Sequence, residues 1–331
     1  MTMGGSMKLE RIQDCITGVL GVVIAVCTGC LVSMSTSSSA EAAHEMQQES
    51  LTPLHLKPRI SYSFASNYQI MWADDLIKVY DAGNTVEMAL DQTSGSGFVS
   101  KNSYYYGNVE MKLKLVPGNS AGVVTAFYMS GKGDTHSELD FEFLGNKSGE
   151  PYQLQTNIYG QGVGGREQRV YLWFDPAAKC HSYSFLWNDH QVVFKVDSVP
   201  VQVLRKTEET AFMYPNQPMQ VFSSIWDGSS WATRGGLDKI DWSQAPFIAS
   251  CRKFELDACQ DDSNILTTKN FSSECQAQLQ SHLWGSTAAT TLNSHERRKY
   301  KYVQENLLVY NYCTDRLRYP TIPPECLITP W

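Results

Sequence analysis

The stretch that decides the fold reads His136-Ser-Glu-Leu-Asp-Phe-Glu-Phe-Leu-Gly145. In an extended chain, successive side chains point to opposite faces. Two sets therefore separate: His136, Glu138, Asp140 and Glu142 on one face, and Leu139, Phe141 and Phe143 on the other. Strict alternation of this kind predicts a β-strand with one face in a core. The other face carries three carboxylates with no basic residue among them.

This row of carboxylates suggests catalysis. Like charges so close repel and raise at least one pKa, a cost that a purely structural strand avoids. Four residues of strand span about 13 Å. Glu138 and Glu142, leaning together over a curved sheet, could approach the separation of about 5–5.5 Å found in retaining glycosidases. Asp140 could bond to one of them and hold a proton. On this pattern alone, a solvated acidic face and a calcium site stay open as alternatives.

Short apolar runs separated by Gly, Asn, Ser and Pro turns surround this strand from about residue 60. The runs predicted as strands are 86–91, 106–116, 122–129, 169–174, 183–187, 192–196 and 219–225. Many alternating strands without a long helical pattern predict an antiparallel sandwich or jelly roll. After about residue 250 the periodicity becomes helical in places, at 274–283 and 295–310, which predicts a C-terminal extension of different character.

Composition limits the class of protein. Hydrophobic residues make up 42% of the 331 residues and charged residues 18%, so we expect one large folded domain or one domain with an extension. The net charge is −7, whereas phosphate contacts require a basic face, so no nucleic-acid partner is expected.

The N-terminal segment predicts secretion. Lys8 and Arg11 precede an apolar run over 15–34, and Ala40-Glu-Ala42 has the form of a cleavage site. We therefore expect a signal peptide over 1–42 and a flexible leader over 43–59. Because the run is almost long enough to cross a bilayer, an uncleaved signal anchor is the alternative. With cleavage, no stable membrane association is expected.

Five of the nine cysteines fall after residue 250, at 251, 259, 275, 313 and 326. No Cys-x-x-Cys pair or histidine spacing indicates a zinc site. Because the secretory compartment is oxidising, we expect disulfides in the C-terminal segment. Spacing alone does not fix their connectivity.

The strand at 136–145 resembles the His-x-Glu-x-Asp-x-Glu-Phe-Leu-Gly signature of plant xyloglucan endotransglucosylase/hydrolases, within glycoside hydrolase family 16. The likeness covers about residues 60 to 327. The other matching stretches are 94–98, 100–102, 113–122, 155–157, 166–169, 172–176, 231–236, 241–243, 310–315 and 323–326. The last two resemble the C-terminal extension that separates this family from bacterial relatives.

The resemblance implies a concanavalin-like β-jelly-roll sandwich of two antiparallel sheets over 60–250, with a disulfide-stapled mixed α/β extension over 251–331. It also implies a secreted enzyme of the cell wall, or apoplast, that cuts xyloglucan and rejoins it. Glu138 would be the nucleophile, Glu142 the general acid/base and Asp140 the helper carboxylate. Xyloglucan would be the donor, and xyloglucan or an oligosaccharide the acceptor. No metal or cofactor is implied, and we expect a monomer.

Substrate-binding positions carry over from the same resemblance: Gln155, Thr156, Asn157, Gly165, Arg166, Glu167, Ser230, Trp231, Gly235 and Arg318. Amides and arginines can bond sugar hydroxyls, and tryptophan offers a flat face to a sugar ring. Taken singly, Gln155 and Asn157 also fit turn or strand-edge roles, and Trp231 also fits a core.

Covalent features follow from the resemblance as well. Family spacing pairs Cys259–Cys275 and Cys313–Cys326, and leaves Cys180 and Cys251 as buried thiols or an extra pair. Asn146-Lys-Ser148 is a glycosylation sequon at the place where family members carry one, and Asn270 begins a second.

Two departures from the family pattern bear on activity. Ser137 stands where the family usually has Asp and Leu139 where it has Ile, and because Ser137 faces the core we expect tuning and not inactivation. The loop at 228–230 reads Gly-Ser-Ser where acidic residues are common, which leaves the acceptor preference open. The short stretch 231–242 resembles transferase members more than hydrolytic ones.

Two alternative functions are kept. One is a hydrolase of xyloglucan or mixed-linkage glucan, which uses the same chemistry. The other is a non-catalytic, lectin-like sandwich that binds polysaccharide, and it is disfavoured because a binding module needs no acid/base pair.

Overall fold

The computed structural model describes residues 61–261 and 282–331. The predictions for the signal peptide, the leader, Cys275 and the sequon at Asn270 lie outside these residues, as does most of the helical pattern over 274–283. In the described part of the chain, no helix is both long and apolar enough to cross a membrane.

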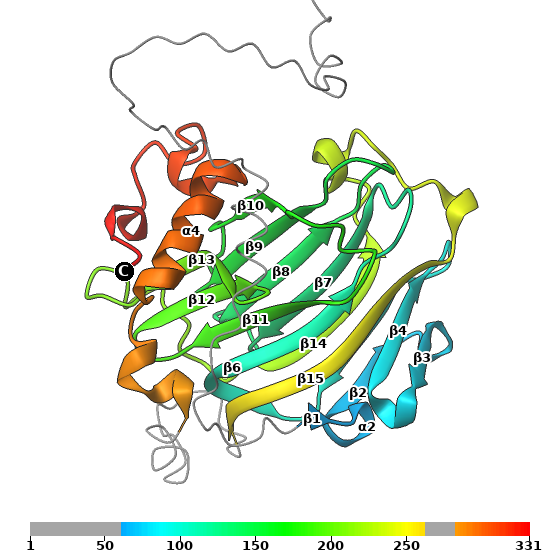
Figure 1. The fold of residues 1–331 in the computed structure, drawn as a ribbon, viewed down its shortest axis with the longest axis horizontal. Helices are drawn as coiled ribbons and strands as arrows, with labels where there is room; N and C mark the ends of the chain where they lie inside the picture. The colour runs from blue at the N-terminus through cyan, green and yellow to red at the C-terminus, as the bar shows by residue number, and fades with distance from the viewer. Residues whose placement is uncertain (1–60, 262–281) are drawn as a thin grey trace, which may run out of the picture. The chain divides into compact units, whose positions relative to one another are not determined.

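Two antiparallel eight-stranded sheets form the predicted sandwich (Figure 1). Sheet A runs in the order β13 (Val199–Arg205), β12 (Gln191–Val196), β11 (His181–Trp187), β6 (Ser103–Lys114), β15 (Phe247–Asp261), β4 (Thr85–Leu90) and β3 (Ile77–Tyr80), and β1 (Ser61–Tyr62) pairs with β15. Sheet B runs in the order β16 (Leu308–Asn311), β10 (Gln168–Tyr171), β9 (Gln153–Tyr159), β8 (Glu138–Leu144), β7 (Val123–Ser130), β14 (Gln220–Asp227), β5 (Ser96–Ser100) and β2 (Tyr68–Trp72). A short helix, α2 (Phe64–Asn67), precedes β2.

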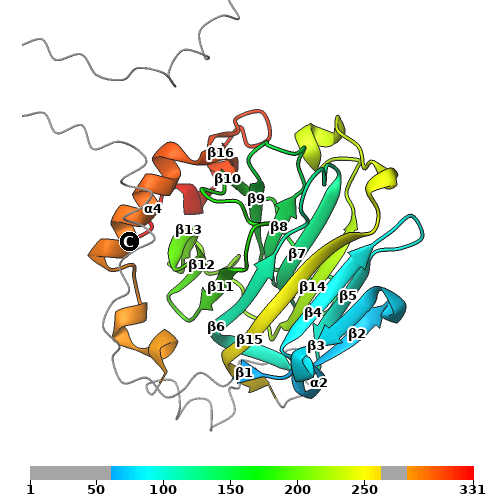
Figure 2. The same ribbon diagram turned by 45° about the vertical axis from the view of Figure 1, so that its right-hand side comes forward.

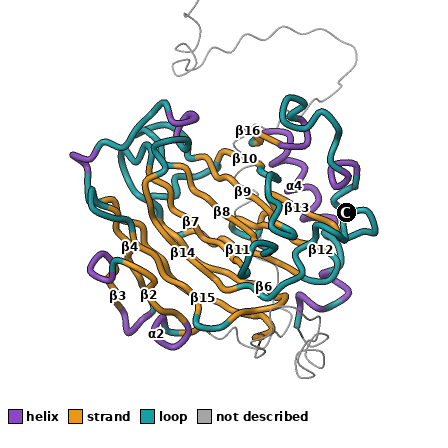
Figure 3. Tube along the Cα trace, turned by 180° about the vertical axis from the view of Figure 1, so that it is seen from behind, coloured by secondary structure: helices purple, strands orange, loops and turns teal. Residues whose placement is uncertain are grey.

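Strand β8 lies in the interior of sheet B, between β7 and β9, and Figure 3 shows this order from behind. Leu139, Phe141 and Phe143 are at most 1% exposed, which confirms the predicted alternation. The ring of Phe141 lies 4.8 Å from that of Phe185 in sheet A. Each such side chain contributes about 1.5–3 kcal/mol on burial. These contacts hold the strand firmly while its opposite face carries the charges.

Ser137 is fully buried, as predicted, and points away from the carboxylate face. Its Oγ accepts a hydrogen bond from the backbone N–H of Asn216 at 3.1 Å. The serine therefore supplies an acceptor to a buried donor, a role that an aspartate could also fill.

The prediction of a helix over 295–310 was wrong at its C-terminal end. Helix α4 (Ser294–Asn306) begins at a capping box formed by Asn293 and Glu296. The following residues form β16, which pairs with β10 at the edge of sheet B. The helix ends at the C-cap residue Leu307, and the chain then pairs with a strand that is distant in sequence. Figure 2 shows β16 beside β10.

The C-terminal extension continues the sandwich. Strand β15 runs without interruption through the predicted boundary at residue 250 and pairs with both β4 and β6. Helix α4 packs against β13 in sheet A, and β16 extends sheet B. The extension thus adds to both sheets.

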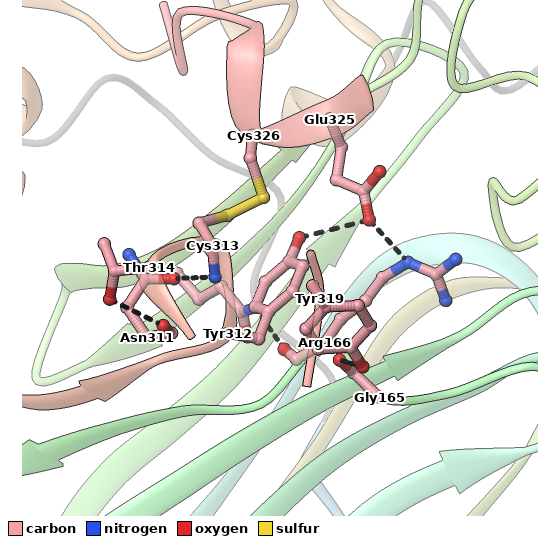
Figure 4. Close-up of a disulfide and its surroundings, with 10 residues drawn as sticks. Gly165, Arg166, Asn311, Tyr312, Cys313, Thr314, Tyr319, Glu325 and Cys326 are labelled. Atoms are coloured by element: carbon pink, nitrogen blue, oxygen red, sulfur yellow. Dashed lines mark hydrogen bonds and ion pairs between the residues drawn. A yellow bond between two sulfur atoms is a disulfide. The ribbon is translucent and has the colours of Figure 1, made fainter. Parts of the chain in front are cut away.

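The expected disulfide between Cys313 and Cys326 is present (Figure 4). Cys259 is also disulfide-bonded, and its expected partner lies outside the described residues, so that pairing stays a prediction. Cys180 and Cys251 are free thiols, and Cys251 is fully buried. Of the two options for these residues, the structure contains the thiols.

Candidate active site

The outer face of β8 carries Glu138, Asp140 and Glu142, one behind the other. Asp140 is only 8% exposed, and the two glutamates are half-buried. On the flanking strands, Asp140 lies opposite Tyr128 of β7 and Asn157 of β9. The central carboxyl is therefore covered on both sides, while its two neighbours reach solvent.

Asp140 holds the proton of this cluster. Burial raises its pKa well above the usual range, and the charges of Glu138 and Glu142 raise it further. Its carboxyl shares a hydrogen bond with Glu138. Because a protonated carboxyl donates, Asp140 is the donor and Glu138 the acceptor. The bond also holds the Glu138 carboxyl in one orientation.

Glu142 has the character of a general acid. Burial raises its pKa most strongly, and the charges of Glu138 and Glu167 add to the effect. A hydrogen bond from Gln155 Nε2 to Glu142 Oε2, 2.6 Å long, acts in the opposite direction, as does the charge of Arg169. A carboxyl with a raised pKa keeps its proton closer to neutral pH and can deliver it to a leaving group.

His136 braces the start of the strand through a hydrogen bond. Its Nδ1 lies 3.0 Å from the carbonyl oxygen of Gly133, which can only accept, so Nδ1 carries the proton. Its Nε2 lies 3.8 Å from Glu138 Oε2, and its ring stacks on Tyr159 with centroids 5.5 Å apart.

A cavity of about 470 Å³ opens beside Glu142. The sandwich and the C-terminal extension both line it, with Glu142, Gln155, Asn157, Tyr159, Glu167, Arg169 and Trp231 from the first, and Tyr310, Asp315 and Arg318 from the second. Five of the predicted binding residues therefore meet next to Glu142: Gln155, Asn157, Glu167, Trp231 and Arg318. Arg318 of the extension and Glu167 of the sandwich form a bidentate ion pair. The Nη1–Oε2 distance is 2.7 Å and the Nη2–Oε1 distance is 3.2 Å.

Five predicted binding residues do not line this cavity, and two of them, Thr156 and Arg166, have buried side chains. Thr156 alternates with Gln155 on β9 and therefore faces the core, where it is 2% exposed. Arg166 is 8% exposed, and its Nε donates to Glu325 at 3.0 Å (Figure 4). Its Nη1 donates to the carbonyl of Val163 at 2.6 Å. Arg166 thus fastens the loop after β9 to the extension, close to the disulfide.

The remaining predicted positions, Gly165, Ser230 and Gly235, are also outside the lining of the cavity. The carbonyl of Gly165 accepts a hydrogen bond from the Tyr319 hydroxyl at 2.5 Å. The φ of Gly165 is +87°, and a Cβ there would lie 2.3 Å from that hydroxyl, so both the backbone and this contact favour glycine. Ser230 is exposed immediately before Trp231, and Gly235 lies in open space with φ of +69°.

Several functional candidates were missed by reasoning from the sequence. Tyr128 stacks on Phe222 at 4.7 Å, and burial, helped by the charges of Glu138 and Asp140, raises its pKa to about 12. Arg169 and Tyr310 lie next to each other on β10 and β16. A signal did exist for Arg169, because it alternates with the apolar Val170 and must point outward.

The sequon residue Asn146 is 8% exposed, and its amide nitrogen donates to the carbonyl of Glu150. A glycan attached to this nitrogen would leave one N–H, which is enough to keep that bond.

The raised pKa of Asp140 predicts that this residue lowers stability at neutral and higher pH. The pKa of Asp140 is raised in the folded protein, whereas in the unfolded chain it is about 3.9. At any pH between these two pKa values, the folded protein holds a proton that the unfolded chain has lost. Wild-type stability therefore falls as pH rises through this window. The variant Asp140→Asn has no such proton. We expect its free energy of unfolding to exceed that of wild type by about 1–3 kcal/mol at pH 8 and to converge with it near pH 3.

Urea unfolding of both proteins at pH 3 and pH 8 measures this difference. If the free energies of unfolding of the two proteins differed equally at both pH values, the titration of Asp140 would not be the cause of that difference.

Comparison with known proteins gives a consistent result. Residues 64–244 match the family described as "Glycosyl hydrolases family 16", and residues 279–326 match "Xyloglucan endo-transglycosylase (XET) C-terminus". "Xyloglucan endotransglucosylase protein 34" of Populus tremula x Populus tremuloides is 46% identical over 272 residues, which cover 82% of this chain and 90% of that protein. "Probable xyloglucan endotransglucosylase/hydrolase protein" of Nicotiana tabacum is 47% identical, with coverage of 81% and 89%. The solved structure of the Bacillus licheniformis beta-glucanase is 21% identical, covers 61% of this chain and 95% of its own, and superposes with a TM-score of 0.49.

Proposed function

We propose that this chain is a retaining xyloglucan endotransglucosylase. The premise is that the chain belongs to the xyloglucan endotransglucosylase/hydrolases of glycoside hydrolase family 16. It would cut the β-1,4-glucan backbone of one xyloglucan chain and join the new end to a second chain or an oligosaccharide. The observation that carries this proposal is the position of Glu142, a carboxyl of raised pKa that lies on the same strand face as Glu138 and at the wall of the cavity.

The first half of the reaction forms a covalent intermediate. Glu142 donates its proton to the glycosidic oxygen, the bond from that oxygen to the anomeric carbon breaks, and Glu138 forms an ester with the same carbon. Asp140 donates its hydrogen bond to Glu138 and so fixes the orientation of the attacking carboxylate. The leaving half of the polysaccharide departs with the proton of Glu142.

The second half reverses the roles. Glu142, now a carboxylate, accepts the proton of the acceptor's 4-hydroxyl, whose oxygen attacks the anomeric carbon and displaces Glu138. Water competes for the same intermediate, so transfer requires that the acceptor be bound and oriented. The cavity beside Glu142 supports that requirement, because Trp231, Arg318 and Tyr310 can stack on or bond to sugars there.

We also propose the cellular setting. A signal peptide over 1–42, which lies outside the described residues, would direct the chain to the cell wall, and the family-16 sandwich would act there as a monomer with its C-terminal extension. Free xyloglucan chains and oligosaccharides would be its partners. Glycosylation at Asn146 and sugar binding by Gln155, Asn157, Glu167, Trp231 and Arg318 belong to this proposal.

Transfer of a labelled acceptor tests the function. The full chain, secreted from a eukaryotic host, is incubated with xyloglucan polymer and a fluorescent xyloglucan oligosaccharide. We expect label to enter the polymer fraction on size exclusion, with few new reducing ends. Reducing ends without label transfer would make the protein a hydrolase. Binding of xyloglucan and mixed-linkage glucan without either product would establish the lectin-like alternative.

A further inference from the structure

One residue from each of four neighbouring strands lines up across the outer face of sheet B. The row runs from Glu142 on β8 through Gln155 on β9 and Arg169 on β10 to Tyr310 on β16, and each residue lies directly opposite the next in the pairing register. Opposed side chains on one face of an antiparallel pair have Cβ atoms about 4.5–5.5 Å apart. The backbone pairing therefore brings these four side chains together.

Hydrogen bonds join the first three members of the row. Gln155 Nε2 donates to Glu142 Oε2 at 2.6 Å, and Arg169 Nε donates to Gln155 Oε1, also at 2.6 Å. Gln155 is 6% exposed, so both ends of its amide are committed in a mostly dry position. The guanidinium carbon of Arg169 lies 5.7 Å from the centre of the Tyr310 ring, and the Tyr310 hydroxyl donates to Asp315 at 2.9 Å.

The chemistry of these groups permits one orientation. An arginine Nε–H can only donate, so Gln155 must turn its amide oxygen toward Arg169 and its NH₂ group toward Glu142. The NH₂ group can also only donate, so Glu142 Oε2 must offer a lone pair to it in both protonation states. In a protonated carboxyl the carbonyl oxygen is the better acceptor, so this bond favours Oε1, the other oxygen of Glu142, as the site of the catalytic proton.

We propose that Arg169 is a positioning residue for the acid/base, which fixes the amide of Gln155 and thereby selects the oxygen of Glu142 that carries the catalytic proton. This inference rests on the proposed function of Glu142. It also gives the C-terminal extension a part in catalysis, because Tyr310 covers the guanidinium of Arg169. A row of this kind holds the acid in the same geometry when it gives up its proton and when it takes one back.

The charges around Glu142 define the expected pH effect. Glu138 on its own strand and Glu167 from the loop before β10 raise its pKa, while Arg169 and the hydrogen bond from Gln155 lower it. On β7, its cross-strand neighbour is the uncharged Ala126. Loss of Arg169 removes a cation and frees the amide, so both effects move the pKa of Glu142 upward. The upper limb of the pH–rate profile should then shift to higher pH although the rate falls.

Two glycosyl donors distinguish an effect of Arg169 on general-acid catalysis from other roles of this residue. Natural xyloglucan has a poor leaving group and needs protonation, whereas an aryl β-glycoside of a xyloglucan oligosaccharide with an acidic phenol does not. For Arg169→Met we expect kcat/KM on xyloglucan to fall by about 10–100-fold and on the aryl donor by less than about 3-fold. Arg169→Lys, which keeps a charged donor, should recover most of the loss. Arg298→Met, which changes an exposed arginine of α4, is the matched control.

A direct titration makes the inference independent of turnover. The carboxyl carbon of Glu142 is followed by ¹³C NMR in the full chain, assigned by its absence in Glu142→Gln. Arg169→Met should raise its midpoint, and Gln155→Glu, which keeps the acceptor for Arg169 but places an oxygen against Glu142, should raise it further. An unchanged midpoint in both variants, or equal losses on the two donors, would overturn the proposal. If wild type turned over neither glycosyl donor, the proposed function would fail. The titration would still show whether Arg169 acts on Glu142 through Gln155.

Discussion

Glu138→Gln is expected to abolish both transfer and hydrolysis, with kcat/KM on xyloglucan reduced by about 10⁴-fold or more. An amide cannot form the ester with the anomeric carbon, so no glycosyl-enzyme accumulates. The change preserves size, and Glu138 is only 21% exposed at a place where Leu139 and Phe141 hold the strand from the opposite face. We therefore expect the thermal midpoint to stay near that of wild type. Initial rates with the fluorescent acceptor measure the loss.

The control for this variant is Glu305→Gln, which removes an exposed carboxylate on α4. It should leave the transfer rate unchanged. Binding of xyloglucan, measured by retardation in a polysaccharide-containing gel, should persist in Glu138→Gln because the cavity beside Glu142 is untouched. Transfer at the wild-type rate would remove Glu138 from the mechanism.

The catalytic strand could be predicted from sequence because its information is local. The alternation of Leu139, Phe141 and Phe143 with the carboxylates fixes which face is buried, and no distant contact is needed to infer it. The same reasoning correctly placed Ser137 in the core. The resemblance grouped Gln155 with Thr156, whereas the alternation along β9, which was not predicted as a strand, turns Thr156 away from the cavity.

The features that could not be predicted depend on pairing between distant segments. Leu308 to Asn311 continue a helical periodicity, and they form a strand only because β10 offers an open edge about 140 residues earlier. The row from Glu142 to Tyr310 needs three registers at once, and no local pattern encodes a register. Arg166 looked like a sugar contact until the structure placed Glu325 beside it.

These non-local pairings explain how the extension contributes to function. It supplies the edge strand of sheet B, one wall of the cavity and the carboxylate that holds Arg166. The Cys313–Cys326 disulfide ties the segment bearing Glu325 to the segment that follows β16. An acceptor bound in this cavity would therefore touch two parts of the chain that are far apart in sequence, and both lie within reach of the acid/base.

Glu142→Ala is expected to cause the second large loss of activity, and it distinguishes the roles of the two glutamates. Without the acid, kcat/KM on xyloglucan should fall by about 10²–10⁴-fold. The aryl donor needs no protonation, so it should still form the glycosyl-enzyme on Glu138, which then accumulates because no base activates the acceptor. Azide is a small nucleophile that requires no base, and the shortened side chain gives it room. We expect azide to restore turnover of the aryl donor.

The configuration of the azide product decides between the two carboxylates. In Glu142→Ala, azide must displace Glu138 from the α-linked glycosyl-enzyme, so the product is the β-glycosyl azide. In the companion variant Glu138→Ala, azide takes the nucleophile's place and attacks the β-linked donor directly, which gives the α-glycosyl azide. Proton NMR of the anomeric centre distinguishes the two products. The opposite pairing of variant and product would exchange the roles of Glu138 and Glu142, and with them the direction in which Gln155 and Arg169 act.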